Sequence, residues 1–358
     1  MSIFGYVRNR PVFRELADLL GPLLPQQADG VRESEPATLI RCSQRAMATL
    51  FEVIMPFGQP DAEKMATRAF EWIDALEEQL TVYRDDSEVS RLNRTAYSEP
   101  VVVEDHLFGL LELAKRIHKE TWGAFDITAG KLIRTWGFFH RQGRMPTPAD
   151  RDGARQSTGM QHVALNAERR SIRYSRDGIE INLGSIGKGY ALDRVGEQLR
   201  RGCDSFMLHA GGSSVVAAGL QPREMRGWKI TIRHPWIDGR SLGSVFLRDR
   251  ALGTSAATYQ HFVHGQKKVG HILDPRTGRP AEGIASATAL APSAAEADAL
   301  ATAFYVLGME KTRLYCQTHP GIGAILLPDG DDAVPQVFGT AVNEFEPNPE
   351  RVDAGVLS

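Results

Sequence analysis

The chain has 358 residues, of which 24% are charged and 42% are hydrophobic, as is usual for a soluble globular protein. Its formal net charge of -2 argues against nucleic acid and anionic membrane surfaces as partners. The three cysteines, Cys42, Cys203 and Cys316, are widely spaced, which excludes a disulfide framework and a zinc pattern.

Residues 1–40 are expected to form an N-terminal helical extension. A short amphipathic helix is predicted near Pro11 to Leu24, and it either packs on its own body or docks a partner. Charged residues interrupt its apolar stretch, so it does not read as a signal peptide. No segment reaches the apolar length of a membrane span, and we therefore expect a cytoplasmic protein without membrane insertion.

Residues 41–340 are expected to form one domain. It begins with a strand-like segment, RAMATLFEVIMPF (45–57), and helices are predicted over 62–80 and 103–121. Strands and long helices then follow without regular βαβ spacing, which predicts an α+β fold. The polar residues 341–358 are expected to form a flexible tail.

A glycine-rich turn carries a lysine between two predicted elements. GIEIN (178–182) alternates like a strand, and YALDRVGEQLRR (190–201) is typical of a helix. The glycines between them would let backbone N–H groups approach an anion, and Lys188 would add a positive charge. The spacing matches neither a P-loop nor a dinucleotide fingerprint, so a tight turn with a solvated lysine explains it equally well.

A second feature is a helix that begins at a capping box, Ser293 and Glu296. Asp298 and Thr302 lie one turn apart on one face of this otherwise apolar helix. A carboxylate and a hydroxyl so placed offer two hard oxygen ligands to Mg²⁺. The alternative is that Asp298 lies on a solvated stripe and Thr302 bonds back to a carbonyl.

Two further turns contribute polar groups. HAGGSSVVAAG (209–219) places two glycines between strands, and GHILDPRTGRP (270–280) has the turn signals of Asp-Pro and Thr-Gly. His271 precedes the second turn. A lone histidine is more often structural than catalytic, so its interest depends on its neighbours.

Taken together, these segments resemble the ApbE family of FAD:protein FMN transferases over about residues 46–327. The resemblance is an ordered series of motifs: AMATLFEV, LTVYRDDSEVSRLN, GAFDITAGKLIRTWGF, INLGSIGKGYALDRV, HAGGSS, HILDPRTGRP and SAAEADALATAFYVLG. It implies an α+β, T-fold-like mixed sheet core with flanking helices and FAD in a central cleft.

The resemblance also implies roles for individual residues. It assigns Mg²⁺ to the carbonyl of Ser185 with Asp298 and Thr302. It places Lys188 and its turn in the pocket of the FAD pyrophosphate and His271 at the reacting phosphate, and these two are the catalytic candidates. The remaining cofactor-binding residues that it implies are Met47 and Tyr83 beside the flavin, Ala124, Phe125 and Asp126 along the nucleotide, and Asn182 in the lysine turn.

The activity implied is Mg²⁺-dependent transfer of FMN from FAD to a threonine of an acceptor protein, with release of AMP. The acceptor would carry a D-x-x-[ST]-G-A-T-like motif. Asp274 to Gly278 match only the first half of that motif, so self-modification at Thr277 is not expected.

Several positions depart from the family pattern. Asn182 and Ser213 replace aspartates, His209 replaces an asparagine, and Ala256 and Ala257 stand where S-G-D or S-G-N is usual. Ala48 and Gly187 also differ, replacing a glycine and an alanine. These changes permit an active enzyme with altered acceptor or flavin handling, or an FAD-binding protein that no longer transfers FMN. Two further alternatives stay open: an FAD pyrophosphatase that forms FMN and AMP, and a generic nucleotide-binding enzyme.

Overall fold

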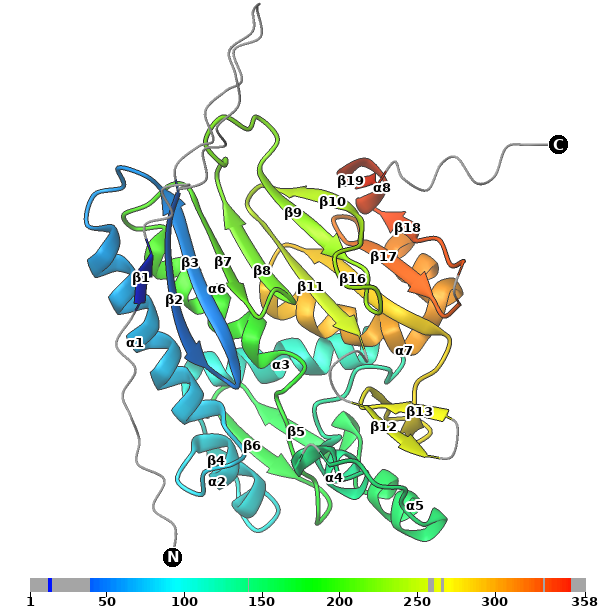
Figure 1. Ribbon diagram of the computed structural model, residues 1–358. Helices are drawn as coiled ribbons and strands as arrows, with labels where there is room; N and C mark the ends of the chain where they lie inside the picture. Colours follow the sequence, from blue (N-terminus) through cyan, green and yellow to red (C-terminus); the bar gives the residue numbers. More distant parts are fainter. Residues whose placement is uncertain are drawn as a thin grey trace, which may run out of the picture.

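Alternating apolar residues build a large sheet with two covered faces. The computed structural model describes residues 12–14, 39–140, 142–256, 261–264, 267–330 and 332–348. In β3 (Thr49–Pro56), Phe51, Val53 and Met55 face one apolar layer and Ile54 faces the other. Among the described residues, nine strands pair antiparallel in the order β1-β2-β3-β7-β8-β11-β16-β17-β18 (Figure 1).

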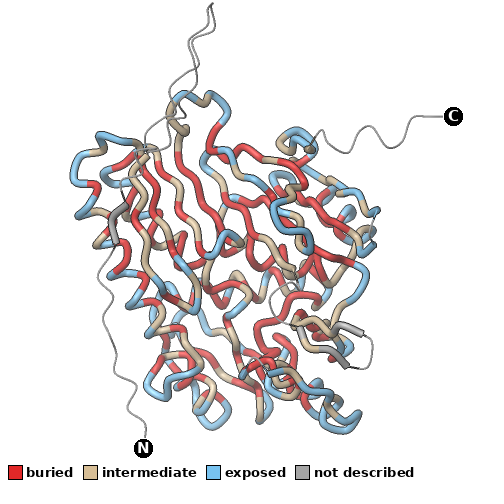
Figure 2. Tube along the Cα trace, viewed as in Figure 1, coloured by how far each residue is buried: buried red, intermediate tan, exposed pale blue. Residues whose placement is uncertain are grey.

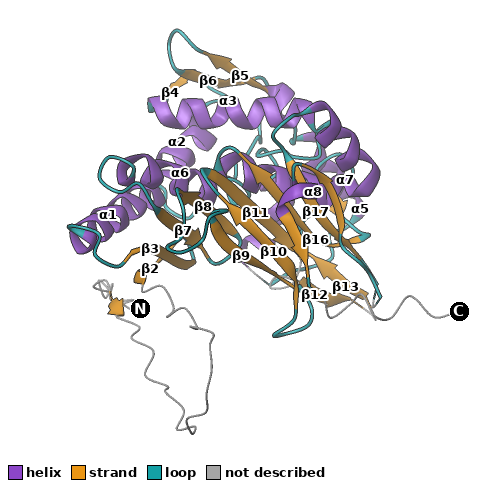
Figure 3. Cartoon of the chain, turned by 90° about the horizontal axis from the view of Figure 1, so that it is seen from above, coloured by secondary structure: helices purple, strands orange, loops and turns teal. Residues whose placement is uncertain are grey.

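The other strands of this sheet are β1 (Val12–Arg14), β2 (Leu39–Ala46), β7 (Phe206–Ala210), β8 (Ser214–Ala218), β11 (Arg250–Ala256), β16 (Ile284–Ala291), β17 (Gly323–Pro328) and β18 (Gln336–Gly339). One face carries α1 (Ala62–Leu80), α6 (Gly187–Leu199) and α7 (Ala294–Thr318), and α3 (Asp105–Glu120) packs outside them against α7, as Figure 3 shows. The other face carries a three-stranded sheet of β9 (Trp228–Arg233), β10 (Ser241–Leu247) and β19 (Phe345–Pro347). Buried residues concentrate in the strands between these layers (Figure 2).

A smaller part lies beside the ends of α1 and α3, in the lower half of Figure 1. It comprises α2 (Glu88–Thr95), β4 (Val101–Val102), α4 (Gly130–Thr135), α5 (Pro148–Gln156), β5 (Val163–Asn166), β6 (Ser171–Tyr174), β12 (His261–His264), β13 (Lys267–Gly270), β14 (Leu273–Asp274) and β15 (Arg279–Pro280). One 3-10 turn, Phe138–His140, follows α4, and another, Met160–His162, precedes β5.

Small residues let α7 lie directly on the sheet. Ala287 and Ala289 of β16 face the helix layer. A Cβ at Gly253 of β11 would come within 2.5 Å of the Ala297 carbonyl. Since Asp298 follows Ala297, this close packing fixes how deep its carboxylate lies.

The α+β fold class is confirmed, and the predicted helices are present as α1 and α3. The segment 45–57, predicted as one strand, is instead a hairpin, because Met47 and Ala48 form a turn between β2 and β3. Both turn residues have positive φ, 46° and 58°, as the favoured two-residue hairpin turn requires.

Both chain ends differ from prediction where the structure describes them. Val12–Arg14 pairs as a strand with β2, so a helix does not cover these residues; 15–24 lie outside the described part. The tail predicted from residue 341 begins with a helix, α8 (Ala341–Glu344), and then β19, which pairs with β10. Ala341 is buried and Phe345 packs against the apolar layer beneath β10, which explains why these residues are folded.

Candidate functional site

The start of α7 is fixed by groups from the helix itself and from α6. Ser293 Oγ accepts the Glu296 N–H at 3.2 Å, as the capping box predicts. The Asp193 carboxylate of α6 accepts the N–H groups of Ala294 at 2.7 Å and Ala295 at 2.8 Å. Burial raises the pKa of Asp193 to about 7. The beginning of α7 is therefore tied to α6, one turn before Asp298.

The Asp298 carboxylate is buried, with 5% of its surface exposed, and so does not lie on a solvated stripe. Its Oδ2 accepts the Gly189 N–H at 2.8 Å and the Ser214 hydroxyl at 2.9 Å, and lies 3.9 Å from Lys188 Nζ. In the part of the chain that the structure describes, no hydrogen bond reaches Oδ1. The two features singled out in the sequence, the lysine turn and the helix, thus meet at one carboxylate.

Opposing effects act on the ionisation of Asp298. Burial raises its pKa, and the charge of Lys188 and the hydrogen bonds from Ser214 and Gly189 work against this rise. The net pKa of Asp298 is raised above its ordinary value, and three groups from two other elements limit this rise.

Thr302 lies one turn along α7 from Asp298. Its hydroxyl donates to the Asp298 backbone carbonyl at 3.3 Å and lies 3.1 Å from Ser255 Oγ at the end of β11. The back-bonding considered for Thr302 is therefore present, although its hydroxyl also meets a second hydroxyl.

The lysine turn does not follow a strand. Within residues 178–182, Gly178 has a positive φ of 77°, the one bridge is Glu180 with Ala129, and the Asn182 N–H donates to the Ile127 carbonyl at 2.7 Å. Asn182 Oδ1 accepts the Gly184 N–H at 2.9 Å, which closes the turn that presents Ser185, half-buried, before α6. The amide at position 182 thus shapes the turn without needing a charge.

The nucleotide-lining residues predicted at 124–126 form a tight loop. Ala124 and Phe125 are buried. Asp126 accepts hydrogen bonds from the Thr128 N–H at 2.8 Å and hydroxyl at 2.6 Å, and its Oδ2 lies 3.1 Å from His118 Nδ1. The carboxylate of Asp126 therefore holds its own loop together.

Tyr83 and His271 approach neighbouring residues of the 3-10 turn after α4. The Tyr83 ring, 69% exposed, lies 4.6 Å from the Phe139 ring, and the His271 ring meets Phe138 edge-on at 6.3 Å. The Arg134 guanidinium covers the Phe139 ring at 3.4 Å. The structure thus gathers Tyr83 and His271 around one turn, and Met47 lies in the β2–β3 hairpin.

Among the residues that depart from the family pattern, His209 contacts a carboxylate on the neighbouring strand of its own sheet. Its Nε2 lies 2.6 Å from Glu52 on the neighbouring strand β3. Burial lowers the pKa of His209, and Glu52 opposes this. Ser213 closes the turn between β7 and β8, Ala256 ends β11, and Ala257 lies outside the described residues.

Sequence reasoning missed three residues that complete this arrangement: Gly189, Ser214 and Asp193. Gly189 and Asp193 lie within the motif around Lys188, and Ser214 ends the HAGGSS motif at the start of an apolar strand. Only the packing of β8 against α7 brings its hydroxyl to Asp298.

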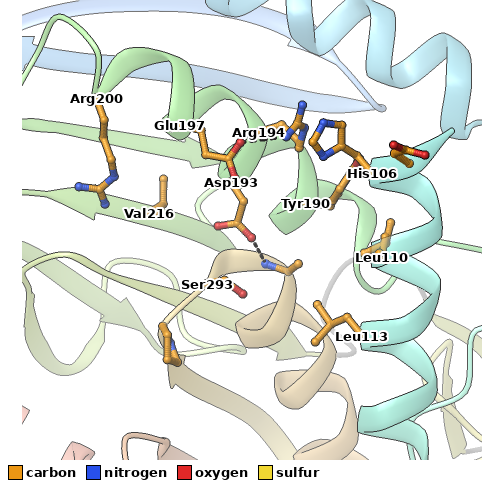
Figure 4. Close-up of a pocket in the computed structure, with 15 residues that line it drawn as sticks. His106, Leu110, Leu113, Tyr190, Asp193, Arg194, Glu197, Arg200, Val216 and Ser293 are labelled. Carbon is orange, nitrogen blue, oxygen red and sulfur yellow. Dashed lines mark hydrogen bonds and ion pairs between the residues drawn. The ribbon is translucent and has the colours of Figure 1, made fainter. Parts of the chain in front are cut away.

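A cleft of about 400 Å³ opens between α3, α6 and the start of α7 (Figure 4). Tyr190, Asp193, Arg194 and Glu197 line it from α6, and none of the predicted site residues does. It is therefore distinct from the meeting point of Lys188 and Asp298.

Across the described ranges, no three His, Cys, Asp or Glu side chains form a cluster suited to a metal ion. The ligand set predicted at Asp298 is of another kind, since it uses one carboxylate, a hydroxyl and a backbone carbonyl. None of the helices in the described part of the chain is long and apolar enough to span a bilayer.

Comparison with known proteins gives a consistent set of relatives. The model of the ApbE family matches residues 47–326. An FAD:protein FMN transferase of Vibrio cholerae is 29% identical over 318 residues, which cover 87% of this chain and 94% of that protein. One of Treponema pallidum is 31% identical over 317 residues, which cover 84% of this chain and 86% of that protein.

Solved structures agree with these sequence matches. The flavin transferase ApbE from Vibrio cholerae superposes with a TM-score of 0.75 at 28% identity, covering 87% of this chain and all of that one. The ApbE protein from Thermotoga maritima gives a TM-score of 0.78 at 26% identity, with the same coverage.

Proposed function

The chain belongs to the ApbE family, and we propose that it transfers FMN from FAD to a threonine of an acceptor protein, with Mg²⁺ bound and AMP released. The observation that carries this proposal is the meeting of Lys188, the Gly189 N–H and the Asp298 carboxylate. A buried carboxylate beside a lysine and a helix N-terminus is suited to hold a pyrophosphate and a cation together. The names of the relatives supply the reaction and the two substrates.

The residues around Asp298 fit Mg²⁺. Its Oδ2 is occupied by protein donors, whereas Oδ1 receives no hydrogen bond from the described residues. Asp298, Thr302 and the carbonyl of Ser185 would supply hard oxygen ligands, the kind that Mg²⁺ prefers. When bound, the ion would offset the negative charge of the phosphate oxygens.

The chain's own groups would orient the substrate. Lys188 would neutralise part of the pyrophosphate charge, whereas the N–H groups of Gly187 and Gly189 are already bonded to the Leu183 carbonyl and to Asp298. Tyr83 offers an exposed ring face to the flat flavin, and Met47 would border the same ring. Ala124, Phe125, Asp126 and Asn182 would shape the wall along the nucleotide through the loops that they close.

The transfer step would form one bond and break one. The acceptor threonine Oγ would attack the FMN phosphorus, the bond from that phosphorus to the bridging oxygen would break, and AMP would leave with that oxygen. His271 would take the threonine proton, since imidazole accepts a proton near neutral pH. His271→Ala should then abolish most transfer while FAD still binds, and unchanged transfer would dismiss this role.

One experiment tests the proposed function. The protein is incubated with FAD, Mg²⁺ and a protein bearing D-x-x-T-G-A-T. Flavin fluorescence that stays on the denatured acceptor, together with one AMP per FMN attached, is the expected result. AMP release without an acceptor would identify an FAD pyrophosphatase instead.

Tight FAD binding without either product would identify an FAD-binding protein without transfer activity. The FAD-binding protein without transfer activity is favoured by the loss of a carboxylate at position 213, where Ser213 closes the β7–β8 turn. Failure to bind FAD would leave a different nucleotide as the substrate. Fluorescence quenching of FAD on binding, measured with and without Mg²⁺, separates these two outcomes.

A further inference from the structure

We propose that Ser214 is a positioning residue for Asp298, whose hydroxyl holds Oδ2 so that Oδ1 is presented to a divalent ion. The inference rests on the proposed function, because that function places the ion at Asp298. It adds a residue to which the sequence analysis assigned no role, although it ends the HAGGSS motif.

The geometry around the hydroxyl supports this role. Ser214 is fully buried at the start of β8, and its Oγ donates to Asp298 Oδ2 at 2.9 Å. The Gly189 N–H donates to the same oxygen from α6 at 2.8 Å. Two donors from two different elements fix one carboxylate oxygen, and this leaves a single rotational position for the other.

Lys188 cannot replace the hydroxyl. Its Nζ lies 3.9 Å from Oδ2, beyond hydrogen-bond length, and it sits on a flexible, partly exposed side chain. Without Ser214, Asp298 would keep one directed bond, from Gly189, about which the carboxylate can turn. The expected consequence is a weaker divalent-ion site in a protein that remains folded.

The same sheet offers a matched control. Thr288 of β16 is also buried, and its hydroxyl lies 2.9 Å from that of Thr254 on β11. Strand alternation puts Thr288 on the same face as Leu290, which packs in the layer beneath β9 and β10, away from α7. Thr288→Val therefore removes one buried hydroxyl and its hydrogen bond to Thr254 on the same sheet, without touching Asp298.

The test measures Mn²⁺ affinity by electron paramagnetic resonance in the full chain with FAD present, since Mn²⁺ accepts the same oxygen ligands as Mg²⁺. Ser214→Ala is expected to weaken Mn²⁺ binding about 10-fold or more, as loss of a group that orients a metal ligand does. Thr288→Val should stay within about twofold of the unchanged protein. Ser214→Thr, which keeps the hydroxyl, should restore most of the affinity.

Equal Mn²⁺ affinity in folded Ser214→Ala and the unchanged chain would overturn the inference, as would a lack of Mn²⁺ binding by the unchanged chain. If Ser214→Ala does not fold, the Mn²⁺ affinity of Ser214→Cys tests the inference instead. The thiol is similar in shape to the hydroxyl but is a weak hydrogen-bond donor, so this variant should also bind Mn²⁺ more weakly. Mn²⁺ affinity that depends on Ser214 in a protein unable to transfer FMN would refute the proposed function alone.

Discussion

The backbone N–H of Gly189 donates a 2.8 Å hydrogen bond to Oδ2 of Asp298, across 109 residues of sequence. This bond joins the first turn of α6 to the side of α7, at the point where Lys188 also approaches the carboxylate. It depends on two helices lying unusually close, and the glycine allows that distance.

Gly189→Ala should disrupt both stability and the site. A Cβ at this position would overlap the Ala294 carbonyl and come within 2.7 Å of the Ala295 nitrogen, so α6 and α7 would have to separate. We expect a loss of about 3 kcal/mol in the free energy of unfolding, as for other overpacked sites, and weaker FAD binding. Urea unfolding and FAD fluorescence quenching measure these two effects.

Gly196→Ala on the same helix is the control for this prediction. The nearest atom to its Cβ would be Val216 Cγ1 at 3.8 Å, an ordinary contact. Alanine should therefore stabilise α6 by up to about 1 kcal/mol through its helix propensity. Equal effects of the two substitutions would refute the close packing of α6 on α7 as the cause.

In Asp298→Asn, Mg²⁺ should no longer stimulate FMN transfer, although the side chain keeps its shape. The amide removes the negative charge that Lys188 and the proposed ion share, and we expect transfer to fall about 100-fold or more. Initial rates of acceptor flavinylation over a range of Mg²⁺ concentrations measure this. Asp204→Asn, at an exposed position, should leave the rates unchanged, and a similar small effect at Asp298 would contradict its assignment.

Ala48→Gly should stabilise the hairpin that carries Met47. Ala48 has a φ of 58°, and a left-handed conformation costs a non-glycine residue about 1–2 kcal/mol. Glycine adds about 0.4–1 kcal/mol of unfolded-chain entropy, so the net gain in unfolding free energy should be about 0.5 kcal/mol. Chemical denaturation measures it.

The neighbouring substitution Ala46→Gly is the control, because it should destabilise the protein. Ala46 is buried in extended backbone at the end of β2, so glycine there should cost roughly 1 kcal/mol. Destabilisation by Ala48→Gly of similar size would show that the turn carries no strain.

The stability of the chain should depend on pH through His118. Burial alone would lower the pKa of His118, but the hydrogen bond and charge of Asp126 outweigh it, and the net pKa is raised above the ordinary 6.5. The contribution of protonated His118 to the free energy of unfolding is therefore complete below about pH 6.5. It is lost as the pH rises through the pKa of His118 in the folded state. Urea unfolding of the unchanged chain between pH 6 and 9 should show this loss.

His118→Gln should remove this part of the pH dependence, because the amide does not titrate. The difference between the two chains isolates His118 from Asp193, whose pKa of about 7 also affects stability in the lower part of this range. If the unfolding free energies of the two chains differ by the same amount at every pH from 6 to 9, the ion pair between His118 and Asp126 is not the source of the pH dependence.

Much of the fold could be predicted from local pattern. The period of apolar residues located α1 and α3, and the Ser293 cap located the start of α7, because these signals arise within one element. The strand predicted over 178–182 was wrong because alternation alone does not supply a pairing partner: only Glu180 forms a bridge. The hairpin at Met47 was missed because neither turn residue is a glycine or asparagine.

The sequence by itself determined the family, the helix that carries Asp298 and Thr302, and the turn that carries Lys188. Only the tertiary structure decided that these groups meet, that Asp298 is buried, and that Ser214 and Gly189 bind its Oδ2. The physical reason is that each of these contacts joins different elements, and their distance is set by how closely α7 packs on small residues of β11, β16 and α6.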